Sequence, residues 1–332
     1  MILVSSVDFD RISRIEIYKN SGGKLPVVKA ATHATHIIPS TLFSWTTNKP
    51  VCHCKINGKV ICKPDYQEWG YAWDDGETPV FCMLPCEKEN YVTCIPLIIN
   101  GNKRGNLQYN PDVGGKRPRP VMGMKNGQLK FYVTTDGRTP EELRDILFRS
   151  GWENAVLFDG GGSNMCFFPE GEIYSSRVIP YFICIWTIPQ GVDKIQKMNK
   201  GFGEVYAFSL KKHGNIYLSK NFRVKEFKCS DGTDTIFIDP KLMNILQDIR
   251  EWAKKPVNIN SGYRTEERNI DVGGALYSRH KYGCAADITV NGKTPKQVYD
   301  YLNKKYPNCC GIGLYSSFVH IDSREEKSRW NG

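Results

Sequence analysis

The chain has 332 residues, of which 40% are hydrophobic and 24% are charged, and its formal net charge is +10. This length is enough for two domains with separate cores, and the composition is typical of globular proteins. No apolar stretch approaches the roughly 18 residues that a membrane span requires, so we expect no membrane span.

The amino-terminal residues are predicted to begin a strand. Asp8, Asp10 and Arg11 stand where the apolar core of an export signal would have to continue, so we expect no signal peptide. Without such a signal, the twelve cysteines are expected to be reduced and mostly buried. A structural zinc site around Cys52 and Cys62 is an alternative, although the cysteine spacing fits no standard zinc finger.

Residues 1–192 are predicted to form a first domain of the α+β class. Short apolar segments broken by Gly, Pro and Asn predict strands, at residues 27–38, 91–101, 127–137, 154–162 and 181–189. One helix is predicted over residues 139–150. Thr139 can cap its first turn, Pro140 suits the first helical position, and Gly151 follows its end.

Residues 193–220 are predicted to be a linker, because apolar periodicity is lost there while Gly and Lys become frequent. Residues 221–332 are predicted to form a second α+β domain. Its expected helices and strands are the helices 240–254 and 294–306 and the strands 256–264, 285–291 and 318–324. The chain is therefore predicted to be two unlike domains in series.

The positive charge is concentrated in the second domain. Residues 1–195 carry 22 basic and 20 acidic side chains, an excess of +2, whereas residues 196–332 carry 23 and 15, an excess of +8. A basic domain is attracted to polyanions, and both nucleic acid and an anionic bacterial wall meet that condition. Because the lysines are scattered and no nucleic-acid motif is present, we expect no nucleic-acid partner.

Two histidines and an aspartate of the second domain form a candidate metal site. His280 and Asp287 lie seven residues apart across a loop that enters a predicted strand, and His320 lies on the last predicted strand. Two imidazoles and one carboxylate are a three-ligand set that leaves a fourth zinc position for water, as catalytic sites require. Each residue alone would be unremarkable, and the prediction rests on all three together.

The residues around these three follow one known pattern in order and spacing. They are Ser261-Gly262-Tyr263-Arg264, Gly273-Gly274-Ala275, the SxHxxGxAxD run from Ser278 to Asp287, Gly311-Ile312-Gly313-Leu314-Tyr315, Phe318-Val319-His320-Ile321-Asp322 and Arg329-Trp330. This series resembles the zinc D-Ala-D-Ala carboxypeptidase family over roughly residues 222–330. The resemblance implies an α+β domain with an antiparallel sheet, Zn²⁺ held by His280, Asp287 and His320, and peptidoglycan as the substrate.

The resemblance also points to residues that accompany the metal. Arg264 is expected to clamp a carboxylate of a peptidoglycan stem, with a surface salt bridge as the alternative. Ser278 is expected to assist through a hydrogen bond. Some relatives place a glutamate three residues before the last ligand, where this chain has no carboxylate, so Asp322 is the nearest candidate base. Asp322 could equally orient a ligand, and carboxypeptidase and endopeptidase action both stay open.

A glycine-rich turn follows a predicted strand of the first domain, with the sequence Asp159-Gly160-Gly161-Gly162-Ser163. Glycines let the backbone approach a ligand closely, and their N–H groups can receive phosphate oxygens. Taken alone, the segment is also compatible with a plain turn. Two further segments precede it, Arg117-Pro118-Arg119-Pro120-Val121-Met122-Gly123 and Thr135-Asp136-Gly137-Arg138.

Together these segments resemble the phosphodiester glycosidase family, whose members include an enzyme that removes α-linked N-acetylglucosamine from a phosphodiester. The similarity covers roughly residues 26–189. It implies that Arg119, Arg138 and the glycine turn bind the substrate, while Asp136 and Asp159 act as acid and base or hold a second divalent cation. The chain departs from the family pattern at Ser40-Thr41-Leu42-Phe43, which leaves the activity of this domain open.

The two resemblances together predict a bacterial cell-wall hydrolase whose partners are peptidoglycan and anionic wall polymers. Without an export signal, the protein is expected to resemble a phage lysin, held in the host cytoplasm until lysis, or a virion-associated enzyme. A bacterial wall-remodelling enzyme is one alternative. A virion or wall-binding protein with a degenerate first site is another, and the oligomeric state stays open.

Overall fold

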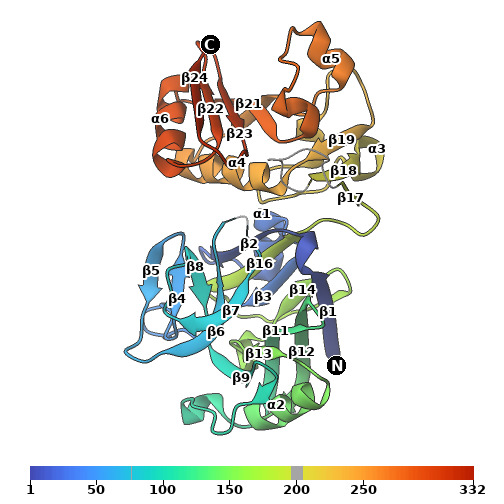
Figure 1. Ribbon diagram of the computed structural model, residues 1–332. Helices are drawn as coiled ribbons and strands as arrows, with labels where there is room; N and C mark the ends of the chain where they lie inside the picture. Colours follow the sequence, from blue (N-terminus) through green and yellow to red (C-terminus); the bar gives the residue numbers. More distant parts are fainter. Residues whose placement is uncertain (76, 196–204) are drawn as a thin grey trace. The chain divides into compact units, whose positions relative to one another are not determined.

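The computed structural model describes residues 1–75, 77–195 and 205–332 and divides into two compact units, Met1–Thr187 and Ile188–Gly332 (Figure 1). Each unit combines antiparallel sheets with a few helices, which confirms the α+β prediction for both domains. No helix within the described ranges has the length and apolar character that crossing a membrane requires.

The amino-terminal unit contains three antiparallel sheets. The first has the order β1-β12-β11-β13-β9-β10, with β1 Ile2–Asp8, β12 Gln128–Arg138, β11 Arg117–Lys125, β13 Asn154–Leu157, β9 Ile95–Ile99 and β10 Asn102–Lys103. The second has the order β15-β14-β3-β16-β2, with β15 Gly171–Ile173, β14 Cys166–Phe168, β3 His36–Pro39, β16 Tyr181–Thr187 and β2 Ile12–Lys19. The third has the order β5-β4-β8-β6-β7, with β5 Lys59–Cys62, β4 Cys54–Ile56, β8 Asn90–Val92, β6 Glu68–Trp73 and β7 Val80–Leu84.

The helices of this unit are short. They are α1 Leu25–Thr32, α2 Pro140–Arg149 and the 3₁₀ turns η1 Phe9–Arg11, η2 Pro111–Val113 and η3 Gly161–Ser163. Helix α2 begins as its sequence predicts, because Thr139 and Glu142 form a reciprocal capping box. Helix α1 lies where an apolar strand was expected: Leu25, Val28 and Thr32 are buried at helical spacing.

The core of the amino-terminal unit determines where the glycine turn lies. All four residues of β13 are buried, and β13 pairs antiparallel with β11, with Leu157 opposite Val121. The Phe158 N–H then donates to the Pro120 carbonyl at 2.9 Å, so pairing with β11 continues one residue beyond the strand. Asp159 therefore emerges at the end of a strand that is fixed on both sides.

The carboxy-terminal unit contains two sheets. A three-stranded sheet has the order β17-β18-β19, with β17 Asp193–Ile195, β18 Val205–Ser209 and β19 Thr235–Ile238. A five-stranded sheet has the order β20-β21-β23-β22-β24, with β20 Val257–Ser261, β21 Ala285–Val290, β23 Val319–Asp322, β22 Gly311–Leu314 and β24 Ser328–Asn331. Its pairings are antiparallel except that β22 and β24 run parallel. The helices are α3 Leu210–His213, α4 Pro240–Ala253, α5 Glu266–Asp271, α6 Pro295–Lys305 and the 3₁₀ turns η4 Val224–Phe227 and η5 Arg279–Tyr282.

The predicted linker, residues 193–220, differs from the structure. Residues 196–204 lie outside the described ranges, but the described part of the segment contains β17, β18 and α3. Val205, Tyr206 and Phe208 are buried, the last two within the carboxy-terminal core, and β18 pairs with β19. The frequent Gly and Lys residues obscured a short strand whose apolar side chains complete that core.

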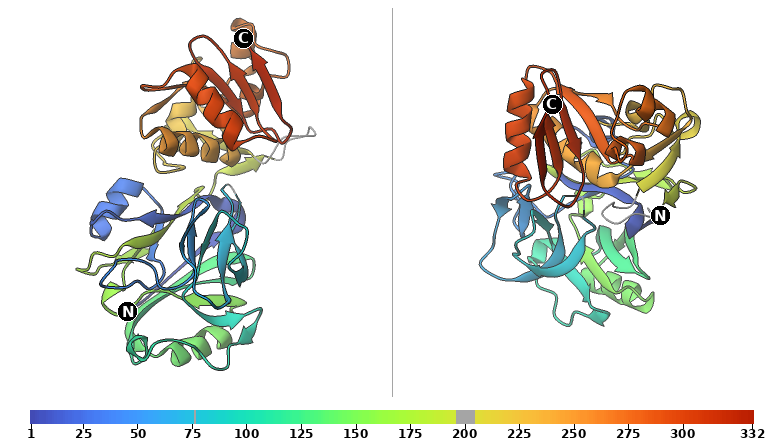
Figure 2. Two further views of the ribbon diagram at one scale, coloured as in Figure 1. Left: turned by 90° about the vertical axis from the view of Figure 1, so that its left-hand side faces the viewer. Right: turned by 45° about the horizontal axis from the view of Figure 1, so that its top comes forward.

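Strand alternation gives the five-stranded sheet two different faces. Val319 and Ile321 of β23 are buried in the apolar core with residues of α4 and α6, and Figure 2 shows α6 lying along this sheet. Successive side chains of a strand point to opposite faces, so His320 and Asp322 lie on the other face. Register places His320 opposite Asp287, and Asp322 opposite Ala285.

Candidate functional site

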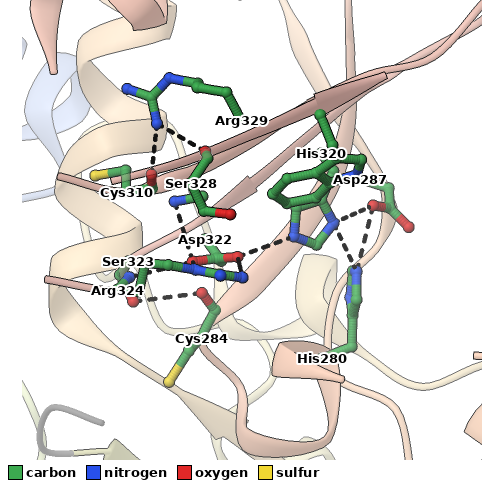
Figure 3. Close-up of polar contacts among 12 residues, drawn as sticks. His280, Cys284, Asp287, Cys310, His320, Asp322, Ser323, Arg324, Ser328 and Arg329 are labelled. Atoms are coloured by element: carbon green, nitrogen blue, oxygen red, sulfur yellow. Dashed lines mark hydrogen bonds and ion pairs between the residues drawn. The ribbon is translucent and has the colours of Figure 1, made fainter. Parts of the chain in front are cut away.

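The structure brings His280, Asp287 and His320 together at one point of the carboxy-terminal unit (Figure 3). His280 comes from η5, Asp287 from β21 and His320 from β23. His320 Nδ1 lies 2.9 Å from Asp287 Oδ1, and His280 Nε2 lies 3.3 Å from both of these atoms. One nitrogen of each ring and one carboxylate oxygen thus converge, as binding to a single ion requires.

Hydrogen bonds on the far side of each ring fix its orientation. His280 Nδ1 lies 2.7 Å from the Gly262 carbonyl, which can only accept, so Nδ1 carries the proton and Nε2 faces the other two groups. His320 Nε2 lies 3.3 Å from Asp322 Oδ2, which leaves Nδ1 facing Asp287. A histidine that binds a metal commonly donates its other N–H to a carboxylate or carbonyl in this way.

Burial and charge set the protonation of the three residues. Burial lowers the pKa of His280, which favours the neutral imidazole that a metal needs. Burial raises the pKa of Asp287, but hydrogen bonds from His280 and His320 outweigh that effect and hold the pKa well below its usual range. For His320, burial lowers the pKa, while Asp287 and Asp322 outweigh it and raise the pKa. The Asp287 carboxylate is therefore ionised, as a metal ligand must be.

Asp322, the candidate base, is fully buried, with 0% of its surface exposed. Arg324 binds both of its oxygens, with Nε 2.7 Å from Oδ1 and Nη2 2.6 Å from Oδ2, and the Gly311 N–H donates to Oδ1 at 3.2 Å. Burial raises the pKa of Asp322, but contacts with His320 and Arg324 outweigh it and hold the pKa well below its usual range. The geometry therefore favours the alternative in which Asp322 orients His320, because an enclosed carboxylate with a lowered pKa is a weak base that substrate cannot reach.

Two glycines of β22 make room for this arrangement. A Cβ at Gly311 would lie 2.2 Å from Asp322 Oδ2, and a Cβ at Gly313 would lie 2.5 Å from the indole of Trp330. The Trp330 ring packs on His320 at 5.2 Å between centroids. The alternation of glycines on β22 is therefore explained by the residues that hold His320 from behind.

A cavity of about 420 Å³ opens beside the three converging residues. Arg264 and Ser278, the two predicted substrate residues, line it, and Arg264 Nη2 lies 2.6 Å from Asp287 Oδ2. Tyr315 and Phe318 also line it as a parallel stack, with ring centroids 4.3 Å apart. The prediction missed these two rings as site residues, although both belong to the motifs that carry the resemblance, because sequence does not show which side of a loop a ring faces.

The donor set fits zinc. Two imidazoles and a carboxylate offer ligand atoms that all lie within 4.8 Å of one another. In the described part of the chain, this is the one group of three or more His, Cys, Asp or Glu side chains that is close enough to share an ion. In the described part of the amino-terminal unit, including the surroundings of Cys52 and Cys62, no second group of three such side chains converges.

In the amino-terminal unit, the glycine turn carries a buried carboxylate. Asp159 is 8% exposed, and its N–H donates to the Ser40 carbonyl at 3.1 Å. Burial raises the pKa of Asp159 to about 6, and the neighbouring Ser163 and Arg177 oppose only part of the increase. A carboxyl group with this pKa can exchange a proton near neutral pH, which is the property of a general acid in glycoside cleavage.

Polar atoms around Asp159 have no hydrogen-bond partner among the described residues. They are Ser40 Oγ, Asp159 Oδ2, Ser163 Oγ and Asn164 Oδ1, all buried. Ser40 contacts Asp159 through its main chain, and Ser163 and Asn164 follow the turn. Buried polar groups are nearly always paired in folded proteins, so four unpaired atoms at one turn indicate a place where a polar ligand binds. Sequence analysis did not identify Ser40 and Asn164 as site residues.

Arg177 also lies at this turn, although no sequence motif pointed to it. A Cβ at Gly162 would lie 2.4 Å from Arg177 Cζ, so the guanidinium lies directly over the glycine turn and a side chain at position 162 would displace it. The same guanidinium lies 4.7 Å from the ring centroid of Trp45. Arg177 is therefore a cation beside Asp159, and its separation of 14 residues from the turn gave no signal in the sequence.

Arg119, which was predicted to bind substrate, and Asp136, which was predicted to act as an acid or base or to hold a cation, make other contacts in the structure. Arg119 is 2% exposed, and its guanidinium donates to the main-chain carbonyls of Val113, Gly114, Gly115 and Arg138. Asp136 is exposed, and its Oδ1 lies 2.8 Å from the Met1 amino group because β1 pairs with β12. Arg119 thus fixes a loop, and Asp136 does not join the buried groups at Asp159. Arg138 keeps a buried Nε without a partner in the described chain and stays a candidate.

Comparison with protein families agrees with this division of the chain. Residues 220–322 match the family described as peptidase M15, and residues 43–192 match the family described as phosphodiester glycosidase. Each unit thus resembles a hydrolase family. Both resemblances predicted from the sequence are confirmed. No curated protein shows significant similarity to the chain.

Solved structures show only a distant likeness. The catalytic domain of zebrafish N-acetylglucosamine-1-phosphodiester α-N-acetylglucosaminidase, auto-inhibited by its pro-peptide, is 14% identical, with a TM-score of 0.45 over 57% of this chain and 83% of that one. A hypothetical protein from Synechocystis is 10% identical, with a TM-score of 0.46 over 56% of this chain and 59% of that one.

In the peptidase M15-like unit, Asp322→Asn tests whether Asp322 orients His320. Loss of the charge weakens the hydrogen bond that fixes the ring, so we expect zinc affinity to fall roughly 10- to 100-fold. Zinc titration of the purified full chain measures this effect. Asp300→Asn, which alters an exposed aspartate of α6, is the matched control. Unchanged zinc affinity in Asp322→Asn, with a loss of peptide cleavage, would instead support a role as base.

In the phosphodiester glycosidase-like unit, Arg119→Met tests the structural role of Arg119. The four carbonyls that it binds would lose a charged donor in a buried place, so we expect the free energy of unfolding to fall by about 2–4 kcal/mol. Urea unfolding measures the change, and Arg149→Met, at an exposed position of α2, is the control. Normal stability with a selective loss of phosphodiester binding would restore Arg119 to the substrate site.

Proposed function

We propose that this chain is a bacterial cell-wall hydrolase whose carboxy-terminal unit is a zinc metallopeptidase for D-alanyl bonds of peptidoglycan stems. The observation that supports this most is the convergence of His280, Asp287 and His320, with each imidazole held from behind by a carbonyl or a carboxylate. The match to peptidase M15 over residues 220–322 supports the same class of reaction.

The residues of the peptidase M15-like unit would have three roles: metal binding, substrate binding and orientation of a metal ligand. His280, Asp287 and His320 would hold zinc. When bound, zinc would polarise a scissile carbonyl and lower the pKa of water, so that hydroxide is available as the nucleophile near neutral pH. Arg264 lines the cavity next to Asp287 and would clamp a stem carboxylate with its guanidinium. Asp322 keeps the His320 ring in place. Apart from Asp287, no Asp or Glu lines the described cavity.

For the amino-terminal unit we propose glycosidase action on a sugar phosphodiester, as in anionic wall polymers. Asp159, with a pKa of about 6, would protonate the leaving oxygen, and Arg177 and Arg138 would bind the phosphate. The four unpaired polar atoms around the turn support a ligand at this place. A phosphodiester would accept hydrogen bonds from the Ser40 and Ser163 hydroxyls, and hydroxyls of the sugar would donate to Asn164 Oδ1.

The proposal is tested by digestion of defined wall fragments with the purified full chain. Peptidoglycan stems that end in D-Ala-D-Ala, cross-linked stems and a sugar phosphodiester are incubated separately, and the products are identified by mass. Release of free D-alanine indicates carboxypeptidase action, and cleavage of cross-links indicates endopeptidase action. Stoichiometric zinc with wall binding but no product from any substrate would favour the wall-binding alternative.

A further inference from the structure

The phosphodiester glycosidase-like unit has a cavity of about 790 Å³ that is lined by residues outside the glycine turn. Four separate segments form its walls: residues 19–22 at the end of β2, residues 47–49, residues 59–61 of β5 and residues 178–181. The Asn20 side-chain amide donates to the carbonyls of Gly23 and Ile179 at 2.7 and 2.8 Å. These bonds tie the first and fourth walls together, so the cavity is fixed by the fold.

The charge of this cavity is one-sided. Lys19, Lys49 and Lys59 line it, and no Asp or Glu is among its lining residues. All three lysines are exposed, and none lies within 4 Å of a carboxylate in the described ranges. The other polar lining residues are Asn20, Ser21, Thr47 and Asn48. Unpaired ammonium groups among amides and hydroxyls suit a ligand that combines anionic groups with hydroxyls.

Two loops run from the neighbourhood of the Asp159 turn to this cavity. Arg177 covers Gly162 of the turn and directly precedes Val178, which lines the cavity. Trp45, which stacks against Arg177, lies two residues before Thr47, another lining residue. The same pair of loops thus borders the turn at one end and the lysine cavity at the other.

We infer that the lysine cavity is a subsite for a second phosphate of a sugar-phosphate polymer whose cleaved linkage lies at Asp159. The inference rests on the proposed glycosidase function and adds its substrate class. A single sugar phosphodiester bound at Asp159 uses Arg177 and Arg138 and leaves the three lysines without an anion. A polymer with repeating phosphodiesters could place one phosphate at the Asp159 turn and another in the lysine cavity.

The test compares a polymer with a monomer. The wild-type full chain and the triple variant Lys19→Gln, Lys49→Gln, Lys59→Gln are assayed on poly(N-acetylglucosamine 1-phosphate) and on methyl N-acetylglucosamine-1-phosphodiester. We expect the KM for the polymer to rise about tenfold, since removal of unpaired cations weakens polyanion binding. On the monomer, kcat/KM should stay within about twofold. The matched control is Lys103→Gln, Lys125→Gln, Lys130→Gln, which removes equal charge from β10, β11 and β12.

Equal effects of the two triple variants would overturn the subsite, because net charge alone would then explain polymer binding. Equal loss on monomer and polymer would overturn it as well. The Kd of the polymer is measured in parallel by calorimetry. If wild type cleaves neither substrate, the proposed glycosidase function fails, and the Kd decides the subsite separately: a tenfold weaker Kd in the lysine variant supports it, and an unchanged Kd overturns it.

Discussion

His320→Ala is expected to abolish both zinc binding and cleavage of peptidoglycan stems. The substitution removes the ligand atom Nδ1 and leaves Asp287 and His280 as a pair, which is too few protein ligands for a catalytic zinc site. We expect peptide cleavage to fall at least about 1000-fold, equivalent to about 4 kcal/mol of transition-state stabilisation. Metal content by mass spectrometry and digestion of defined stems measure the two effects.

Two controls accompany His320→Ala. His213→Ala changes a histidine of the same unit that lies outside the converging group and should keep zinc and activity. Cleavage of a sugar phosphodiester by the His320→Ala chain should also persist, because that site is built from residues of the other unit. Full peptide cleavage by His320→Ala would show that the metal assignment is wrong.

Asp159→Asn is expected to remove sugar-phosphodiester cleavage while peptide cleavage continues. The amide keeps the shape of the carboxyl group but cannot donate a proton to a leaving oxygen, so we expect a loss of about 100- to 10,000-fold in kcat. Product release from methyl N-acetylglucosamine-1-phosphodiester measures it. Asp112→Asn, at an exposed position of η2, is the control. Unaltered cleavage by Asp159→Asn would exclude this carboxylate as the acid.

The same variant has a consequence for stability that depends on pH. The pKa of Asp159 is raised by burial to about 6, so the native state binds a proton more tightly than the unfolded chain does. The stability that this proton contributes is present below about pH 4 and is lost as pH rises through 6. Asp159→Asn should therefore be more stable than wild type at pH 8, by up to about 2–3 kcal/mol, with little difference at pH 4. Urea unfolding at both pH values measures this, and a difference of the same size at pH 4 would contradict the linkage.

The sequence by itself determined where helix α2 begins and which three residues form the candidate metal site. Helix α2 begins at the predicted cap because the Thr139 and Glu142 side chains bind backbone groups three residues away. Interactions over so short a distance along the chain can be predicted from the sequence. His280, Asp287 and His320 could be predicted for a different reason. They stand in a motif with fixed spacing, and register between β21 and β23 converts that spacing into contact.

Only the tertiary structure decided which polar residues lie together at the two candidate sites. Arg119 and Asp322 both lie in motifs that suggest contact with substrate. In the structure, Arg119 binds main-chain carbonyls and Asp322 is enclosed by Arg324. Segments that are distant in the sequence bury these side chains, so the motifs alone could not predict it. Arg177 reaches the glycine turn from a distant loop, which no local pattern encodes. Strand β18 was not predicted for a similar reason. Its apolar side chains pack against residues that are distant in the sequence, and no pattern within the strand shows these contacts.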